Sequence, residues 1–261
     1  MLQFRHASRA SQGKRTYQED ASAVWQPDSG AGSRDGGIAL VAVLADGMGG
    51  HAGGALASGT VCAAFLTALR ARDGSVGERL KFALTEANSA IADAVVGNPG
   101  LTGMGATLVG VAFAADGAEW VSVGDSPLYL VRRGEIARLN EDHSLAPMLD
   151  RLVADGRLSP EQAKIDPRRH YLRSAVSGEE LDLIDVSRRP LMLEAGDVIV
   201  IASDGIHTLG DEAIARLVAQ NASYGVDAIA AALIETVDRA ADAMQDNTTV
   251  IVIGVDDSVT L

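Results

Sequence analysis

Five aspartates at the ends of apolar runs constrain this chain more than any other feature. They are Asp20, Asp46, Asp125, Asp204 and Asp246. The run 38–45 leads into Asp46, the run 198–203 leads into Asp204, and the run 248–255 follows Asp246. Buried carboxylates at strand ends repel one another unless a cation lies between them. Because hard oxygen ligands suit Mg²⁺ or Mn²⁺, we expect a carboxylate-rich metal centre at one edge of a sheet core.

Composition and charge narrow the class of protein. The chain has 261 residues, 47% of them apolar, which is ample for a core. It carries 22 Lys and Arg against 35 Asp and Glu, a formal net charge of −13. Binding a nucleic acid needs a basic surface, so we expect no nucleic-acid partner. The negative charge suits a protein that holds cations, although ordinary solubility explains it as well.

The one cysteine and the absence of long apolar runs bear on reactivity and location. Cys62 lies in an apolar stretch with no nearby His, which predicts a small core residue rather than a nucleophile. No N-terminal segment resembles a signal peptide. The chain has no run of about 18 apolar residues, so we expect no membrane span. We therefore expect a cytoplasmic protein with no membrane partner.

Hydrophobic periodicity and turn signals predict the elements. Residues 38–45 predict a central strand, 52–72 and 78–96 predict two amphipathic helices, and Asn98-Pro99-Gly100 ends the second helix. Asp116-Gly117 and Arg133-Gly134 predict hairpins within an antiparallel meander of strands at 107–113, 119–123, 128–131 and 135–139. A strand at 198–203, helices at 211–220 and 226–243, and a strand at 248–255 follow.

Strands flanked by two pairs of helices predict an α+β fold. Its economical form is a central β-sandwich of two packed antiparallel sheets with the helix pairs outside. No linker or repeat divides residues 1–261, so we expect a single domain. The charged stretch 144–169 is the one excursion expected from the core.

Glycine follows two of the strand-end aspartates. Asp46-Gly47 lies between a predicted strand and a predicted helix, where the Gly47 carbonyl could itself bind an ion. The alternative is a plain strand-to-helix turn with Asp46 as the helix cap. Asp204-Gly205 and Asp246-Asn247 could likewise be turns. Three such motifs, all at strand ends, make turns alone a weaker explanation.

Other polar residues suggest phosphate binding and proton transfer. Arg15 could bind a phosphate bidentately while Glu19 and Asp20 orient metal-bound waters, or Arg15 could form a surface ion pair with them. Histidines are the usual general acids and bases near neutral pH. His51, His143 and His170 are the candidates, and a hydrogen-bonded structural role is the alternative for each.

Taken in order, the motifs resemble the metal-dependent serine/threonine protein phosphatases of type 2C, in particular their compact bacterial members. The resemblance covers nearly the whole chain. It rests on seven stretches: Arg15-Thr-Tyr-Gln-Glu19-Asp20, Asp46-Gly-Met-Gly-Gly-His51, Gly103-Met-Gly-Ala-Thr107, Gly124-Asp125-Ser126, Asp142-His143-Ser144, Ser203-Asp204-Gly205 and Asp246-Asn247-Thr248-Thr249-Val250.

The resemblance implies a site with two Mn²⁺ or Mg²⁺ ions. Asp46 would bridge both ions, with the Gly47 carbonyl on one of them, and Asp204 and Asp246 would hold the other. Glu19 and Asp20 would act through bound waters, and Asp125 would contribute to a third, weaker site. Arg15 would hold the substrate phosphate. Residues 144–178 would form a flap beside the active site.

The resemblance also implies an activity and partners. A water activated by the two ions would hydrolyse phosphoserine and phosphothreonine on proteins, without a covalent phosphoenzyme. Phosphorylated proteins and a cognate Ser/Thr kinase are the expected partners, and the chain is expected to be a monomer. A non-catalytic pseudophosphatase and a small-molecule or nucleotide phosphoesterase are the alternatives. A pseudophosphatase would be expected to lack a metal carboxylate, and none is missing here.

Three departures from the family pattern stand out. Pro127 replaces the Arg that usually follows Gly-Asp-Ser, and Thr208 lies where some members carry another Asp. In the flap, Arg173 lies one place early. The first concerns a scaffold position, the second bears on the third metal site, and the last bears on substrate preference.

Overall fold

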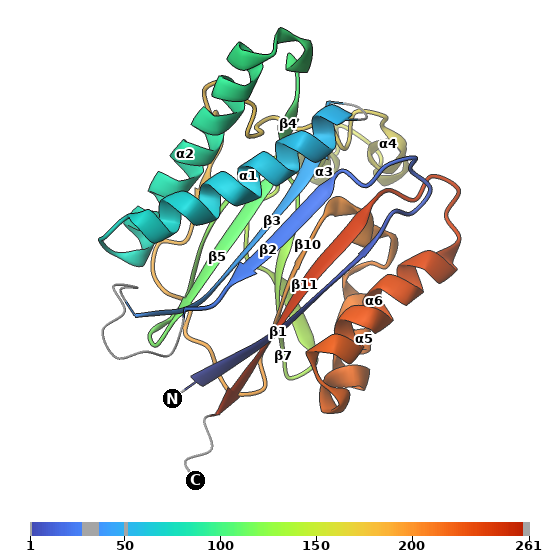
Figure 1. Ribbon diagram of the computed structural model, residues 1–261. Helices are drawn as coiled ribbons and strands as arrows, with labels where there is room; N and C mark the ends of the chain where they lie inside the picture. Colours follow the sequence, from blue (N-terminus) through green and yellow to red (C-terminus); the bar gives the residue numbers. More distant parts are fainter. Residues whose placement is uncertain (1, 28–36, 50–51, 258–261) are drawn as a thin grey trace.

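Two antiparallel β-sheets pack face to face in the computed structural model, and pairs of helices cover their outer faces (Figure 1). The structure describes residues 2–27, 37–49 and 52–257. Its architecture confirms the predicted α+β sandwich. Both chain termini lie at the same end of the molecule, where the first and last strands run side by side (Figure 1).

The strands divide into two sheets of mixed sequence order. One sheet contains β1 (Leu2–Ser11), β7 (Leu128–Arg132), β8 (Glu135–Arg138), β10 (Val198–Ala202) and β11 (Thr248–Asp257). The other contains β2 (Asp20–Trp25), β3 (Ile38–Met48), β4 (Gly105–Ala106), β5 (Leu108–Ala114), β6 (Gly117–Val123) and β9 (Asp185–Val186). The first has the order β1-β11-β10-β7-β8, and the second has the order β2-β3-β5-β6-β9, with β4 paired to β3.

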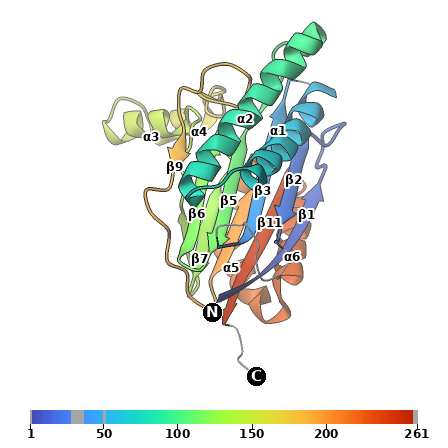
Figure 2. The ribbon, with the colours of Figure 1, turned by 60° about the vertical axis from the view of Figure 1, so that its left-hand side comes forward.

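The helices cover the two outer faces and one side. Helices α1 (Ala52–Ala71) and α2 (Val76–Gly97) pack on the sheet that contains β3. Helices α5 (Asp211–Asn221) and α6 (Val226–Ala240) pack on the other sheet. Figure 2 shows α3 (Ala146–Ala154) and α4 (Pro160–Ile165) projecting from the side of the sandwich. Short 3₁₀ helices span Pro99–Leu101, Asp204–Thr208 and Ala222–Tyr224.

Three apolar clusters fill the spaces between the four layers. In β3, Val41 and Val43 pack toward α1 and α2, whereas Leu40 and Leu44 pack toward the other sheet. Successive side chains of a strand point to opposite faces, so a strand buried on both faces must be apolar throughout. This explains the unbroken apolar run of β3. Asp46 continues the face of Leu40 and Leu44, so the strand directs it into the space between the sheets.

Helix α1 is a core helix with unusual composition. Its stretch Gly53–Ala71 has a mean hydropathy of 1.3, long and apolar enough by composition to cross a membrane. In the structure Val61, Phe65 and Leu69 are fully buried in the cluster between α1, α2 and the sheet. Burial on one face against a sheet is typical of a core helix.

Most predicted elements are confirmed, and two details are wrong. Asp116-Gly117 and Arg133-Gly134 form the hairpins β5–β6 and β7–β8, but these hairpins belong to different sheets rather than to one meander. Strands β1 and β2 had no predicted counterpart. Both contain few large apolar residues, because each lies at the edge of its sheet. Most side chains of β1 are exposed.

Candidate metal centre

Strand register brings the first two acidic residues together. Asp20 at the start of β2 lies directly opposite Asp46 near the end of β3. Residues opposite one another on antiparallel strands share a face, so both side chains point into the space between the sheets. Asp46 therefore lies within a strand and is not the cap of α1, which begins at Ala52.

The other sheet supplies two further acidic residues. Asp204 follows β10 and begins a 3₁₀ turn, and Asp246 lies two residues before β11. Between them and the first pair, the hydroxyl of Ser203 donates to Asp20 Oδ2 at 2.7 Å. This hydrogen bond joins the two sheets at the point where their strands end. We call Asp20, Asp46, Asp204 and Asp246 the carboxylate floor.

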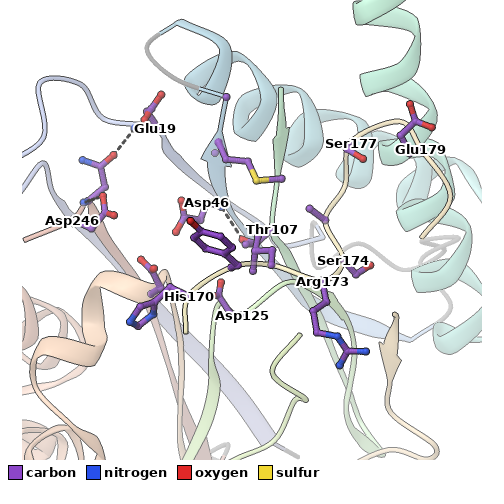
Figure 3. Close-up of a pocket in the computed structure, with 18 of the residues that line it drawn as sticks. Glu19, Asp46, Thr107, Asp125, His170, Arg173, Ser174, Ser177, Glu179 and Asp246 are labelled. Atoms are coloured by element: carbon purple, nitrogen blue, oxygen red, sulfur yellow. Dashed lines mark hydrogen bonds between the residues drawn. The ribbon is translucent and has the colours of Figure 1, made fainter. Parts of the chain in front are cut away.

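The carboxylate floor lies at the bottom of one cavity. The cavity has a volume of about 720 Å³ and is lined by Asp46, Asp204 and Asp246 together with Arg15, Glu19, Gly47 and Asp125. Figure 3 shows Glu19, Asp46, Asp125 and Asp246 around this hollow. Seven of the eight predicted site residues therefore line one cavity; the eighth, Asp20, lies beneath it opposite Asp46.

Several carboxylate oxygens in this region lack a partner. Glu19 Oε1, Asp20 Oδ1 and Asp204 Oδ1 are buried and accept no hydrogen bond among the described residues. A buried acceptor without a donor is costly, and a cation is the natural compensation for several of them together. The donor set is made of hard oxygens, which fits Mn²⁺ or Mg²⁺.

Burial and mutual repulsion shift the titration of these groups. Burial, and then the charges of Asp20, Asp204, Asp125 and Asp246, raise the pKa of Asp46 well above its ordinary value. Burial and the neighbouring charges raise the pKa of Asp204 to about 8. Burial and Asp142 raise the pKa of Asp125 to about 6. Burial also raises the pKa of Asp20, and the Ser203 hydrogen bond opposes that shift. Such shifts indicate a concentration of negative charge that a cation would relieve.

The acidic side chains are near one another but do not converge on a single point. Among the described residues, no three Asp, Glu, His or Cys side chains converge on one point as a metal cage would require. Asp246 is ion-paired with Arg15, and its Oδ1 accepts from the Asn247 backbone N at 2.8 Å. The fit to a metal therefore rests on the donor chemistry and the unpartnered oxygens.

Backbone contacts around Asp46 and Glu19 fix their positions. Thr107 Oγ1 accepts a hydrogen bond from Asp46 N at 3.0 Å and shares another with Ser126 Oγ at 2.7 Å. Glu19 N donates to Asn247 Oδ1 at 2.7 Å, and Gly47 N donates to Glu19 O at 3.1 Å. The sequence alone did not predict these supporting roles. The only signal for them was that Thr107, Ser126 and Asn247 fall within the noted motifs.

Glycine at 47 permits this close packing. A Cβ there would lie 2.1 Å from the Gly54 carbonyl oxygen and 2.5 Å from that of Glu19. No side chain fits between β3, α1 and the segment before β2.

The candidate histidines differ in their surroundings. His143 is buried, and its Nδ1 accepts a hydrogen bond from Gly124 N at 3.2 Å. This is the hydrogen-bonded structural role that the sequence left open as the alternative to proton transfer. Its Nε2 then carries the proton of the neutral ring, and burial lowers the pKa of His143. His170 is exposed and lines the cavity, as Figure 3 shows. His51 lies outside the described residues.

Arg138 of strand β8 contacts the backbone of Asp125. The Arg138 guanidinium of β8 donates to the Asp125 backbone carbonyl at 2.7 Å and to Asp142 Oδ2 at 3.1 Å. The backbone carbonyl of Pro127, at the first departure from the family pattern, accepts a hydrogen bond from Ala202 N at 3.1 Å. Thr208, at the second departure, donates to the side chain of Gln245.

Cys62 shows no sign of reactivity. It is buried in the cluster between α1, α2 and the sheet. Burial raises the pKa of its thiol to about 12, so the thiolate is not available as a nucleophile. The predicted core role is confirmed.

Sequence comparisons agree with the geometry. The family model of protein phosphatase 2C matches residues 16–247. The serine/threonine protein phosphatase PstP of Mycobacterium tuberculosis is 38% identical over 179 residues, covering 67% of this chain and 34% of PstP. The serine/threonine phosphatase Stp of Listeria monocytogenes is 30% identical over 178 residues, covering 66% of this chain and 68% of Stp. The matched segment thus spans about a third of the mycobacterial relative.

Solved structures extend the likeness to the whole fold. A crystal structure of M. tuberculosis PstP superposes with a TM-score of 0.79 at 32% identity, covering 98% of this chain and 100% of that one. The catalytic domain of PstP in complex with two manganese ions gives a TM-score of 0.76 at 33% identity, with the same coverage. The matched family model, the sandwich and the clustered acidic motifs agree. This chain belongs to the protein phosphatase 2C family.

Proposed function

We propose that this chain is a Mn²⁺- or Mg²⁺-dependent protein serine/threonine phosphatase that hydrolyses phosphoserine and phosphothreonine on proteins. The observation that carries the proposal is the set of buried unpartnered oxygens of Glu19, Asp20 and Asp204 at or beside one cavity lined by Asp46, Asp204 and Asp246. Family membership and the manganese-bound relative support the same chemistry.

Two divalent cations fit the donor set. Asp46, the Gly47 carbonyl, Asp204 and Asp246 would hold them, and Glu19 and Asp20 would act through waters. Asp125 would contribute to a third ion. Bound cations of this kind lower the pKa of a water and neutralise charge on a phosphoryl group.

Two of the chain's own groups face the substrate side of the cavity. Arg15 lines the cavity and is about half exposed, as binding a phosphate requires. The leaving Ser or Thr oxygen must acquire a proton, and His170 is exposed in the same cavity. His143 is buried and already accepts a hydrogen bond through Nδ1, which favours His170 over it.

The wider setting follows from the same proposal. Residues 1–261 would act as one catalytic domain, with residues 144–178 as a flap beside the cavity. The chain would act as a cytoplasmic monomer on phosphoproteins and oppose a Ser/Thr kinase. A pseudophosphatase fits less well, because Asp46, Asp204 and Asp246, the acidic residues expected to hold the two ions, are all present. A nucleotide phosphoesterase fits less well, because the matched family acts on proteins by its description.

Replacing one floor residue tests the proposal. Asp204→Asn should reduce Mn²⁺-dependent hydrolysis of a phosphothreonine peptide by more than the roughly 100-fold that loss of an outer-sphere partner costs. Isothermal titration should show weaker Mn²⁺ binding by the same variant. Asp227→Asn, an exposed aspartate on α6, is the matched control and should keep wild-type activity. Full activity of Asp204→Asn would refute the site, and preferred hydrolysis of nucleotides would refute the substrate class.

A further inference from the structure

A loop formed by residues 174–183 lines the cavity on the side of helix α2. Of the residues that line the cavity, six belong to this loop: Ser174, Ala175, Ser177, Glu179, Glu180 and Asp182. We call Glu179, Glu180 and Asp182 the acidic wall. In Figure 3 Ser177 and Glu179 lie beside helix α2, across the hollow from Asp246.

One side chain of α2 holds this loop by two backbone hydrogen bonds. Asn88 Oδ1 accepts from Gly178 N at 2.9 Å, and Asn88 Nδ2 donates to Glu179 O at 2.8 Å. Both polar groups of the Asn88 amide are therefore used on consecutive residues of the loop. Gly178, with φ +83°, lies so close to α2 that a Cβ there would approach Ala92 Cα to 2.8 Å.

Two further contacts tie the loop to the rest of the site. Val176 and Ala106 exchange backbone hydrogen bonds of 2.9 and 3.0 Å, and Ala106 pairs with Gly47 of β3. The Ser174 hydroxyl donates to Leu183 O at 2.9 Å and accepts from Leu183 N at 3.2 Å, which closes the loop. The backbone of the acidic wall is therefore placed relative to the strand that carries Asp46.

The charges of the acidic wall are not compensated within the described chain. Glu179, Glu180 and Asp182 are exposed and make no ion pair with a described residue. The described Arg side chains that line the cavity are Arg15, which is paired with Asp246, and Arg173, which lies just before the loop. A bound phosphoresidue brings about two further negative charges near neutral pH. A substrate with a cation next to its phosphoresidue would therefore be favoured here.

The same cavity independently indicates a charged ligand. Asp204, which lines it, keeps Oδ1 buried without a hydrogen-bond partner, and Glu19 Oε1 does the same. These oxygens belong to the cation site at the bottom. The acidic wall lies at its rim, where the residues that flank a phosphoserine or phosphothreonine would pass.

We propose that the acidic wall selects phosphopeptides with Arg or Lys beside the phosphoresidue, and that Asn88 is the positioning residue that holds the wall in place. The proposal rests on the proposed phosphatase function and goes beyond it by naming a substrate class. Asn88 contacts no reacting atom in this scheme; it acts through the backbone of Gly178 and Glu179.

The test compares two phosphothreonine peptides that differ only in whether Arg or Glu flanks the phosphoresidue. With Mn²⁺, the wild-type protein should show a kcat/KM about five- to tenfold higher for the Arg peptide, as expected for a few partly exposed ion pairs. The double variant Glu179→Gln/Glu180→Gln should bring this ratio close to one. Glu86→Gln/Asp93→Asn, two exposed acids on α2 outside the cavity, is the matched control and should keep the ratio.

Asn88→Ala tests the positioning role. It should raise KM for the Arg peptide several-fold while kcat on that peptide changes by less than twofold, because the floor is untouched. A thermal melt shows whether the variant is folded. If Asn88→Ala is unfolded, Asn88→Asp, which keeps the acceptor for Gly178 N but loses the donor to Glu179 O, should show the same KM effect.

The outcomes separate this inference from the function beneath it. Hydrolysis of p-nitrophenyl phosphate by the wild-type protein reports the phosphatase chemistry alone. If that hydrolysis is present and the two peptides are used equally, or the Gln variant keeps the preference, the acidic wall is refuted. If the wild-type protein hydrolyses neither the aryl phosphate nor the peptides with Mn²⁺, the phosphatase function is refuted and this inference falls with it.

Discussion

The carboxylate floor and the acidic wall face the same cavity, yet they are built in opposite ways. Floor residues lie at the ends of strands, where register places them, and burial, followed by neighbouring charges, raises the pKa of Asp46 and of Asp204. Wall residues sit on an irregular loop with exposed side chains, and only their backbone is held. The difference teaches that one site can separate chemistry from selection: changes in the floor should alter turnover, and changes in the wall should alter which substrate is used.

The largest expected effect comes from the centre of the floor. Asp46→Asn should lower Mn²⁺-dependent turnover by more than about 100-fold, because the residue that would bridge both ions loses its charge. The same change should stabilise the metal-free protein at pH 8, since it removes a buried carboxylate that its neighbours repel. Kinetics and thermal melts measure both. A wall variant that lost as much turnover would contradict the separation of roles.

Replacing a glycine beside the floor should destabilise the fold more than replacing a glycine beside the wall. Gly47→Ala places a Cβ 2.1 Å from a backbone carbonyl oxygen and should destabilise the fold by about 3 kcal/mol. Gly178→Ala meets Ala92 atoms at 2.8 Å with φ +83° and should cost about 2 kcal/mol. Urea unfolding measures both free energies. An equal or reversed order would show that the wall is held as tightly as the floor.

The pH dependence of stability should come from the floor. The pKa of Asp204 rises from 3.8 to about 8 on folding, so the folded protein binds more protons than the unfolded chain between these values. The stability that Asp204 contributes to the metal-free protein is then fully present below about pH 4 and is lost as pH rises through about 8. The melting temperature in a chelator should drop by about 10 °C between pH 5 and pH 8.

Divalent cations should reverse that trend. Because bound cations favour ionised carboxylates, Mn²⁺ should raise the melting temperature more at pH 8 than at pH 5. In Asp204→Asn the pH dependence in chelator should shrink. A melting temperature in chelator that rises with pH would contradict the assignment of the raised pKa values to the floor.

The smallest effect is expected in residues 144–178, which we propose to form a flap. Arg169 pairs with Asp150 at 2.8 Å, and the Asp150 side chain is 58% exposed. Such a pair contributes about 1 kcal/mol or less, so Arg169→Ala should change neither the unfolding free energy by more than that nor kcat on an aryl phosphate by more than twofold. Urea unfolding and steady-state kinetics measure these. A larger loss of kcat would mean that the flap takes part in the chemistry.

The floor was largely predictable because its signals are local. An apolar run followed by Asp identified the ends of β3 and β10, and Asp-Gly and Arg-Gly turns identified two hairpins. The sheet partner of each hairpin was not predictable, since Gly124–Pro127 can lead β7 back beside β6 or across to the other sheet with the same local sequence. Strand β1 was missed because an edge strand with one weakly buried face carries almost no periodic apolar signal.

The sequence by itself determined the acidic chemistry, the α+β class and the family. These depend on residue types at short spacing, and alternation along a strand fixes which face each side chain takes. Only the tertiary structure decided that Ser203 bonds Asp20 across the sheets, that His143 supports Gly124, and that Asn88 holds a loop about 90 residues away in sequence. Such contacts depend on the relative placement of whole layers, and packing between layers leaves no mark on the spacing of residues within either one.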